Sequence, residues 1–338
     1  MTLLSDCTSL ADVAALTASL PAADMQAAQA ATDRQMSLTK PPGALGRLED
    51  LAVFMASWQG TDRPQITEAQ ALVFAGNHGV CAQGVNPFPQ AVTAQMVANF
   101  EAGGAAINQL CAVSGAALSV IALDLDRPTA DITEADAMSA EDTLDAMRRG
   151  AEAVSPTAQV IVLGEMGIGN STIAAALGLA AFGGTAADWV GRGTGSDDAG
   201  VARKADVVAR AVARAEGRRG LEMLAALGGR EQAAICGAVL EARARRIPVI
   251  LDGFICTAAV APLQDADPTA LFHCVVGHAS REPGHQKLVE AMQMDPILSL
   301  DMALGEGSGA ALALGVLRAA LACHNGMATF AEAGVSDA

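Results

Sequence analysis

A single glutamate between two glycines near the C-terminal end of the chain is the residue best placed to do chemistry. Glu306 lies in the segment Leu304-Gly305-Glu306-Gly307-Ser308-Gly309, which enters an apolar helical stretch over 310–322. Glycines let the backbone approach a ligand closely, and a helix start offers unpaired N–H groups. If Glu306 is desolvated, its pKa rises from about 4.3 toward roughly 6 to 7, where a carboxylate is a useful general base. A solvated acid, or a partner for the helix dipole, is an equal alternative.

Two further glycine-rich segments could bind an anion such as phosphate. In the first, Glu165 is followed by Gly167-Ile168-Gly169-Asn170-Ser171, which joins a predicted strand to a predicted helix. The second is Gly191-Arg192-Gly193-Thr194-Gly195, with Lys204 about two turns into the next helix. A tight turn with an N-cap residue is the ordinary alternative for both. The first segment lacks the third glycine of a dinucleotide fingerprint and the spacing of a Walker loop, which disfavours dehydrogenases and P-loop enzymes.

Another candidate group suits a flat heterocycle. His78 follows the first predicted strand, where functional residues tend to collect, and a core position is the alternative for its side chain. The segment 84–90 supplies the aromatic ring of Phe88 and the amide of Gln90. A proline-braced loop that packs on its neighbour explains the same segment equally well.

The elements that must position these residues alternate between apolar runs and amphipathic stretches. Continuous Val/Ile/Leu runs predict buried parallel strands over 69–75, 117–123, 160–163, 248–251 and 271–276. Helices are predicted between them over 90–100, 140–154, 172–181, 199–215 and 231–246. This alternation indicates a doubly wound, mainly parallel α/β fold. Because polar residues follow each strand, including Asp124 after the second and Asp252 after the fourth, we expect them to converge on one crevice.

The chain ends differ from this central region. The first 65 residues read as helices interrupted at Lys40-Pro41-Pro42-Gly43, and the region beyond about 285 returns to helix and loop. We predict N-terminal helices over 1–65, a large α/β domain over 66–285, and a C-terminal segment over 286–338. The C-terminal segment carries Glu306 and completes a small helical domain with the N-terminal helices.

Composition excludes several classes of function. A net charge of −16 disfavours nucleic-acid binding, which depends on Lys and Arg. We expect no membrane span and no signal peptide, and therefore a soluble, cytoplasmic protein. The seven cysteines are an odd number without CxxC spacing, which fits reduced thiols. The spacing of Cys274, His278 and His285 matches no usual zinc pattern, so we predict no metal and no cofactor.

Five segments in this order strongly resemble the nicotinate-nucleotide:dimethylbenzimidazole phosphoribosyltransferase family. They are Lys40 to Gly46, Phe74 to Val80, Gly164 to Thr172, Leu251 to Phe254 and Leu304 to Gly309. The similarity runs from about residue 30 to the end of the chain. Asn77 departs from the pattern, because many relatives carry an acid there, and its role stays open.

The resemblance implies transfer of 5-phosphoribose from nicotinate mononucleotide to 5,6-dimethylbenzimidazole, giving α-ribazole 5′-phosphate and nicotinate for the lower ligand of cobalamin. It also implies a homodimer with a Rossmann-like large domain. Glu306 matches the family's catalytic base, and the displacement would invert the anomeric carbon.

The same analogy suggests roles for the other candidates. Glu165 would hold the sugar and base, the turn containing Gly167, Gly169, Asn170 and Ser171 would approach the phosphate with Gly193, and Lys204 would offset its charge. The benzimidazole pocket would contain His78, Phe88, Gln90 and Leu304. A phosphoribosyltransferase for adenine or a phenol, or a non-catalytic nucleotide-binding relative, is the alternative.

Overall fold

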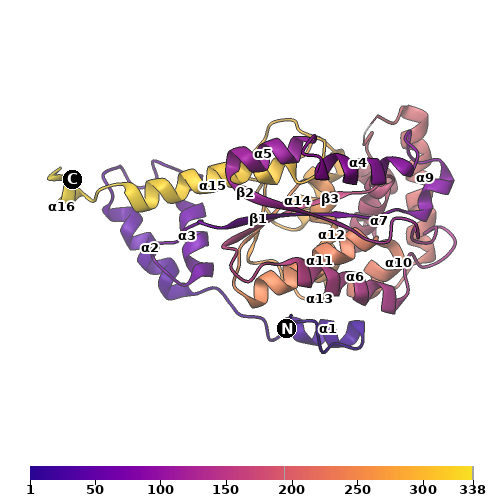
Figure 1. The fold of residues 1–338 in the computed structure, drawn as a ribbon, viewed down its shortest axis with the longest axis horizontal. Coiled ribbons are helices and arrows are strands. Elements are labelled where there is room, and N and C mark those ends of the chain that lie inside the picture. Colours follow the sequence, from indigo (N-terminus) through magenta and orange to yellow (C-terminus); the bar gives the residue numbers. More distant parts are fainter. Residues whose placement is uncertain (194, 337–338) are drawn as a thin grey trace.

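Five parallel strands form the centre of the part of the chain that the computed structural model describes, residues 1–193 and 195–336. They are β1 (Ala69–Ala75), β2 (Ala116–Ala122), β3 (Val160–Met166), β4 (Val249–Leu251) and β5 (Cys274–Val276). Their order is β2-β1-β3-β4-β5, and neighbouring strands pair in parallel. The winding reverses between β1 and β3, so helices cover both faces of the sheet (Figure 1). The predicted doubly wound α/β fold is confirmed.

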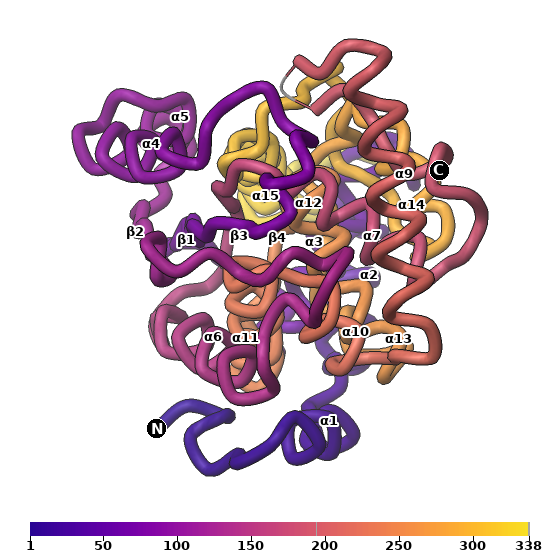
Figure 2. The backbone as a smooth tube through the Cα atoms, turned by 90° about the vertical axis from the view of Figure 1, so that its right-hand side faces the viewer, coloured from indigo at the N-terminus to yellow at the C-terminus, as the bar shows by residue number. Residues whose placement is uncertain are grey.

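Alternate side chains of the strands enter a hydrophobic core on each face of the sheet. In β3, Ile161 and Leu163 point to one core, while Val160 and Val162 point to the other. The first core lies under α6 (Ala140–Ala153) and α11 (Arg230–Ala244), which pack on each other. The second lies under α4 (Ala91–Glu101), α5 (Ala106–Ser114) and α15 (Ser308–Gly326). Figure 2 shows these groups on opposite sides of the strands. Burial on both faces explains the continuous apolar runs of β1 and β3, whereas β2 at the edge of the sheet is half-buried or exposed.

An outer set of helices extends the molecule beyond β4 and β5. These helices are α7 (Asn170–Phe182), α8 (Ala186–Trp189), α9 (Asp198–Arg214), α10 (Gly220–Leu227), α12 (Phe254–Ala259), α13 (Ala261–Ala266) and α14 (Pro283–Ala291). A short 3₁₀ helix, η1 (Gly79–Gln83), follows β1. None of the helices in the described residues is long and apolar enough to cross a membrane.

Helices from the two ends of the sequence lie together at one end of the molecule, although the N-terminus itself does not (Figure 1). Helix α2 (Met25–Ser37) packs on α3 (Arg47–Gln59), and α3 packs on α15, while α16 (Phe330–Ala333) follows nearby (Figure 1). The Arg34 Nε donates to the carbonyl of His324 at 2.8 Å, which ties α2 to the last turn of α15. Helix α1 (Leu10–Thr17) lies instead against α6 and α10. The domain boundaries stay a prediction. Helix α1 does not lie with the other N-terminal helices.

Candidate active site

The loops that follow β1, β3, β4 and β5 meet segment 303–306 around a cleft. This is the carboxyl edge of the sheet, where doubly wound folds bind their ligands. The predicted site residues that line the cleft are Phe88, Glu165, Gly167, Gly169, Asn170, Ser171, Gly193, Lys204, Leu304 and Glu306. Segments far apart in the sequence therefore come together here, while the role of each residue stays a prediction.

Glu306 sits in an unusual backbone turn. The φ angles of Gly305, Glu306 and Gly307 are 84°, 64° and 83°, so three successive residues adopt the left-handed conformation. Such a conformation is costly for a glutamate and natural for its glycine neighbours. The turn packs directly on β3, where a Cβ at Gly164 would lie 2.6 Å from the Glu306 carbonyl oxygen. The fold thus places the Glu306 side chain in the cleft at a fixed angle.

The Glu306 carboxyl is buried and only partly satisfied. The residue is 7% exposed, and its Oε2 has no hydrogen-bond partner among the described residues. Burial is the main cause that raises the pKa of Glu306, and the negative charge of Asp252 raises it further. A carboxylate with a raised pKa and an unpartnered oxygen can accept a proton from a bound substrate.

Asp252 holds the Glu306 turn in place. It directly follows β4, is 1% exposed, and accepts hydrogen bonds from the N–H groups of Gly307 at 3.2 Å and Ala310 at 2.9 Å. These donors belong to the first turn of α15 and have no partner within the helix. His278 lies behind Asp252, with Nε2 3.5 Å from Oδ1. Asp252 therefore caps α15 and fixes Glu306 at the same time.

Glu165 differs from Glu306 in its environment. It is 4% exposed, and the amide of Asn170 donates to its Oε2. Burial, followed by the charges of Asp252 and Glu231, raises the pKa of Glu165 well above its usual value. The protonated form is thus favoured, and in that form the carboxyl can donate a hydrogen bond to a substrate oxygen or nitrogen.

A lysine and the loop before α9 also line the cleft. Lys204, on α9, is 3% exposed and its Nζ lies 3.4 Å from the Ser171 Oγ and 3.3 Å from the Gly191 carbonyl. Burial lowers the pKa of Lys204, while the nearby Glu282 raises it in part. Thr194, part of the predicted anion-binding loop, lies outside the described residues. Ser171, Gly193 and Lys204 can together surround an anion.

Exposed apolar side chains form the mouth of the cleft. Phe88 is 46% exposed and Leu304 is 49% exposed, and both line the cleft. The Asn86 amide donates to the Phe88 carbonyl at 2.6 Å, which braces the loop that carries the ring. A flat aromatic substrate could stack or pack between such side chains.

His78 and Gln90, the other predicted pocket residues, do not line the cleft. His78 is 0% exposed, and its Nε2 lies 2.7 Å from the Glu231 carboxylate. The Gln90 amide donates to the His78 carbonyl. A Cβ at Gly167 would lie 3.0 Å from the His78 Nε2, so the histidine supports the Gly167 turn from behind. We expected His78 in the site because it follows a strand. Nothing in the neighbouring sequence indicated that Glu231 would hold it in the interior.

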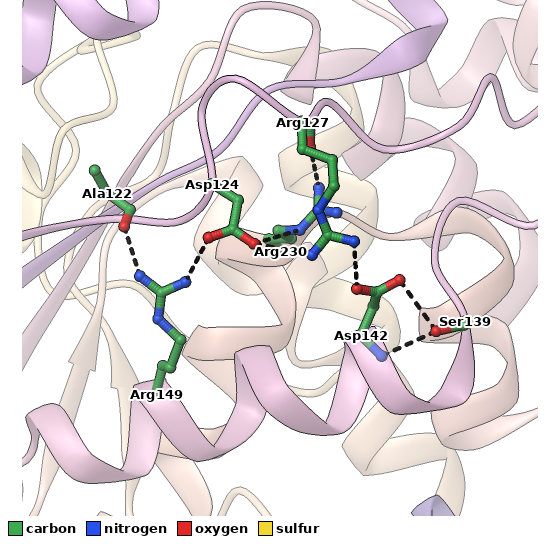
Figure 3. Close-up of polar contacts among 7 residues, drawn as sticks. All are labelled: Ala122, Asp124, Arg127, Ser139, Asp142, Arg149 and Arg230. Atoms are coloured by element: carbon green, nitrogen blue, oxygen red, sulfur yellow. Dashed lines mark hydrogen bonds and ion pairs between the residues drawn. The ribbon is translucent and has the colours of Figure 1, made fainter.

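Asp124 also lies apart from the cleft. Its carboxylate pairs with Arg127 at 2.9 Å and with Arg149 at 3.1 Å, and Arg127 also pairs with Asp142 at 2.7 Å (Figure 3). The Arg230 side chain donates to the Arg127 carbonyl at 2.6 Å, which links this network to the start of α11. The expectation that every strand-end polar residue enters one crevice is therefore wrong for Asp124, whose carboxylate forms ion pairs with arginines instead.

Thirteen of the residues that line the cleft were absent from the predicted site, and five of these have polar side chains. The polar ones are Asn86, Asp252, His278, Ser280 and Glu282. Asp252 and the segment 277–280 directly follow predicted strands and were expected in the crevice on that ground, without an assigned role. Glu282 carried no such signal, because it precedes Pro283 at the start of α14.

Comparison with known proteins agrees with this architecture. A parallel α/β sheet whose cleft contains buried carboxylates and a buried lysine beside glycine turns suits an enzyme that acts on a phosphorylated substrate. A family profile described as "Phosphoribosyltransferase" matches residues 20–335, which places the chain in that class of transferases.

Individual relatives define the family more closely. The chain is 63% identical to the nicotinate-nucleotide–dimethylbenzimidazole phosphoribosyltransferase of Rhodobacter capsulatus, over 97% of this chain and 98% of the relative. It is 58% identical to the enzyme of the same name from Ruegeria sp. strain TM1040, over 99% and 100%. The crystal structure of the Thermus thermophilus protein so named superposes with a TM-score of 0.87 at 40% identity, over 93% of this chain and 100% of the other. The chain belongs to this phosphoribosyltransferase family.

Proposed function

We propose that the protein transfers the 5-phosphoribosyl group of nicotinate mononucleotide to 5,6-dimethylbenzimidazole, giving α-ribazole 5′-phosphate and nicotinate. The relatives carry the names of these two substrates. The observation that carries the proposal is the Glu306 carboxyl, buried in the cleft with an oxygen that lacks a hydrogen-bond partner among the described residues. It shares the cleft with an anion-binding wall around Lys204 and an apolar mouth.

Glu306 acts as the general base in this proposal. One ring nitrogen of dimethylbenzimidazole uses its lone pair to bond to the anomeric carbon, and the other ring nitrogen gives its proton to the Glu306 carboxylate. The bond from the anomeric carbon to the pyridinium nitrogen breaks, and its electron pair leaves with nicotinate. The leaving group needs no acid, because its nitrogen is already cationic. A single displacement turns the β-linked donor into an α-linked product.

The other side chains position the substrates. Lys204, Ser171 and the Gly193 N–H bind the phosphate, and protonated Glu165 donates a hydrogen bond near the sugar. Phe88 and Leu304 contact the benzimidazole ring. Good orientation of two reactants can contribute about 7 to 11 kcal/mol to the lowering of the barrier, whereas proton transfer to a base contributes roughly 10²- to 10⁴-fold in rate. Most of the acceleration therefore comes from positioning.

We also propose that the enzyme is a cytoplasmic homodimer that takes part in assembly of the lower ligand of cobalamin. Its seven cysteines are free thiols, which fits a reducing compartment. Met25 and Met36 of α2 are 72% and 56% exposed, and such apolar groups on a helical surface suit contact with a second copy. Sedimentation velocity at several protein concentrations tests the dimer; a monomer at all of them would contradict it.

The reaction is tested by chromatography and mass spectrometry of the purified protein with nicotinate mononucleotide and dimethylbenzimidazole. Glu306→Gln retains the shape of the side chain and removes the base, so it should fold and bind substrates but lose roughly 10²- to 10⁴-fold in kcat. Adenine and a phenol serve as alternative acceptors, because an apolar pocket discriminates weakly between similar rings. Absence of ribazole phosphate with a folded wild-type protein would refute the reaction, and wild-type kcat in the variant would exclude Glu306 as the base.

A further inference from the structure

Glu282 is an acidic residue at a helix start that does not cap its own helix. It is the N-cap residue of α14 and precedes Pro283, yet its side chain makes no capping hydrogen bond. Its Oε1 instead accepts a hydrogen bond from the N–H of Gly193 at 3.0 Å. Gly193 lies in the loop between α8 and α9. Glu282 is also one of the residues that line the cleft. The carboxylate therefore uses an N–H group that an anion in this part of the cleft would use.

The second oxygen of Glu282 is buried against the same loop. Oε2 has no hydrogen-bond partner among the described residues. It lies where a side chain on Gly191 would otherwise sit, since a Cβ there would collide with this oxygen. A buried oxygen without a donor is costly for an ionised carboxylate and is easily satisfied when the oxygen carries a proton.

The charges around Glu282 come from two directions. Lys204 reaches toward it from α9, and Arg281 precedes it in its own loop. Both favour the ionised form, as does the Gly193 N–H, but burial outweighs them and raises the pKa of Glu282. Lys204 itself donates to the Ser171 Oγ and to the Gly191 carbonyl, so it is shared between the carboxylate and the anion-binding groups.

We propose that Glu282 couples binding of the donor phosphate to uptake of one proton, so that it determines which charge state of the site accepts the substrate. The inference rests on the proposed function, because Ser171, Gly193 and Lys204 are assigned there to the phosphate. An ionised Glu282 competes for the Gly193 N–H and for the field of Lys204, and it repels a dianionic phosphate. A protonated Glu282 releases the N–H to the phosphate and donates its own hydrogen bond to a phosphate oxygen.

The sign of the pH dependence follows from linkage. The bound phosphate, being negative, raises the pKa of Glu282 above its value in the free protein. The complex then binds more protons than its separate components, so affinity is full at low pH and weakens as pH rises through the free-protein pKa. One linked proton increases the Kd by about tenfold per pH unit in this range.

Isothermal titration calorimetry of the full chain tests the coupling, with ribose 5-phosphate and nicotinate mononucleotide as probes. Measurements run from about pH 5 to 9 in buffers of different ionisation enthalpy, and the second pKa of a phosphate monoester near 6 affects the wild type and the variants alike. We expect the wild-type Kd to rise with pH and about one proton more to be taken up than in Glu282→Gln. The glutamine still offers an oxygen to Gly193 but cannot titrate, so its Kd changes less with pH and is lower than that of the wild type at high pH.

Glu290→Gln is the matched control. Glu290 is an exposed residue of the same helix, with Oε1 3.2 Å from the Gln286 amide, and the substitution removes the same charge. It should retain the pH slope and proton uptake of the wild type. Glu290→Gln leaves Glu282 beside Lys204, so proton uptake by Lys204 is the same in this control as in the wild type. Glu282→Gln removes the charge that raises the pKa of Lys204, so any proton uptake by Lys204 increases in that variant and works against the expected difference.

Several outcomes separate this inference from the proposed reaction. Equal pH slopes and equal proton uptake in wild type and Glu282→Gln would overturn the inference, even if both proteins produce ribazole phosphate. Wild-type binding of ribose 5-phosphate without proton uptake would overturn it regardless of whether the variant folds. Proton-linked binding of ribose 5-phosphate that disappears in Glu282→Gln would support it, even in a protein that does not turn over nicotinate mononucleotide.

Discussion

Replacement of Asp252 by alanine tests how the fold holds the proposed base. The two carboxylate oxygens accept the N–H groups of Gly307 and Ala310, at 3.2 Å and 2.9 Å, and the residue is 1% exposed. Alanine removes both acceptors, and water has little access to the donors. The Glu306 turn, with its three left-handed residues, then loses the contact that anchors it to the end of β4.

The magnitude follows from the number of donors left without a partner. A buried polar group without a hydrogen bond costs about 1 to 3 kcal/mol, so two such groups lower the free energy of unfolding by roughly 2 to 6 kcal/mol. Removal of the Asp252 charge also relieves its repulsion of Glu306, which places the expected loss in the lower part of that range. Asp252→Asn keeps one acceptor oxygen and should lose about 1 to 3 kcal/mol.

Urea unfolding followed by circular dichroism measures these losses, and the product assay measures kcat for the same proteins. Asp145→Ala is the control, because Asp145 is an exposed residue of α6 and its substitution should change stability by less than about 0.5 kcal/mol. We expect Asp252→Ala to lose turnover as well as stability, since the base is no longer held in place. A free energy of unfolding within about 1 kcal/mol of the wild type would refute the capping role of Asp252.

Further predictions concern the base, the phosphate site and the buried support. The pH profile of kcat/KM should have an acidic limb above the usual glutamate pKa of about 4.3, because burial raises the pKa of Glu306 and its protonated form cannot accept a proton; a limb at or below that value would contradict this. Lys204→Met should weaken binding of ribose 5-phosphate by roughly 10- to 100-fold in calorimetry, the loss of one charged hydrogen bond, and unchanged affinity would exclude a phosphate contact. Glu231→Ala leaves the buried His78 without its partner and should lower the free energy of unfolding by about 3 to 5 kcal/mol in urea; a loss below about 1 kcal/mol would be inconsistent with a structural pair.

The sequence predicted the central strands β1 and β3 well because they are buried on both faces, whereas the residues of the edge strand β2 are half-buried or exposed. The run over 69–75 coincides with β1, and the run over 117–123 is displaced by one residue from β2 (Ala116–Ala122). Continuous apolar runs of this kind arise when both sides of a strand face a core. Helix α10 (Gly220–Leu227) was not predicted, because nearly all of its residues are buried and it lacks an amphipathic pattern.

The site was predictable where local backbone chemistry marks it. Gly305 and Gly307 beside Glu306, and Gly169 after Gly167, have positive φ angles that other residues adopt less easily. Such glycines can be recognised in the sequence. Glu282 could not be selected in this way, because its partner Gly193 is 89 positions away and the pairing depends on how α14 packs. His78 shows the converse problem: a strand-end position favoured the cleft, while its partner Glu231 holds it in the interior.

Three of the carboxyl groups in the cleft are distinguished by their surroundings. Asp252 uses its oxygens to accept the N–H groups of α15, so it has little capacity to accept a substrate proton. Glu165 is buried beside other acids, which raises its pKa well above the usual value and favours the form that donates. The pKa of Glu306 is raised by burial and by Asp252, and the residue retains an oxygen without a partner among the described residues. Because environment rather than residue type separates these groups, moving the glutamate to another position in the same cleft would not produce an equivalent base.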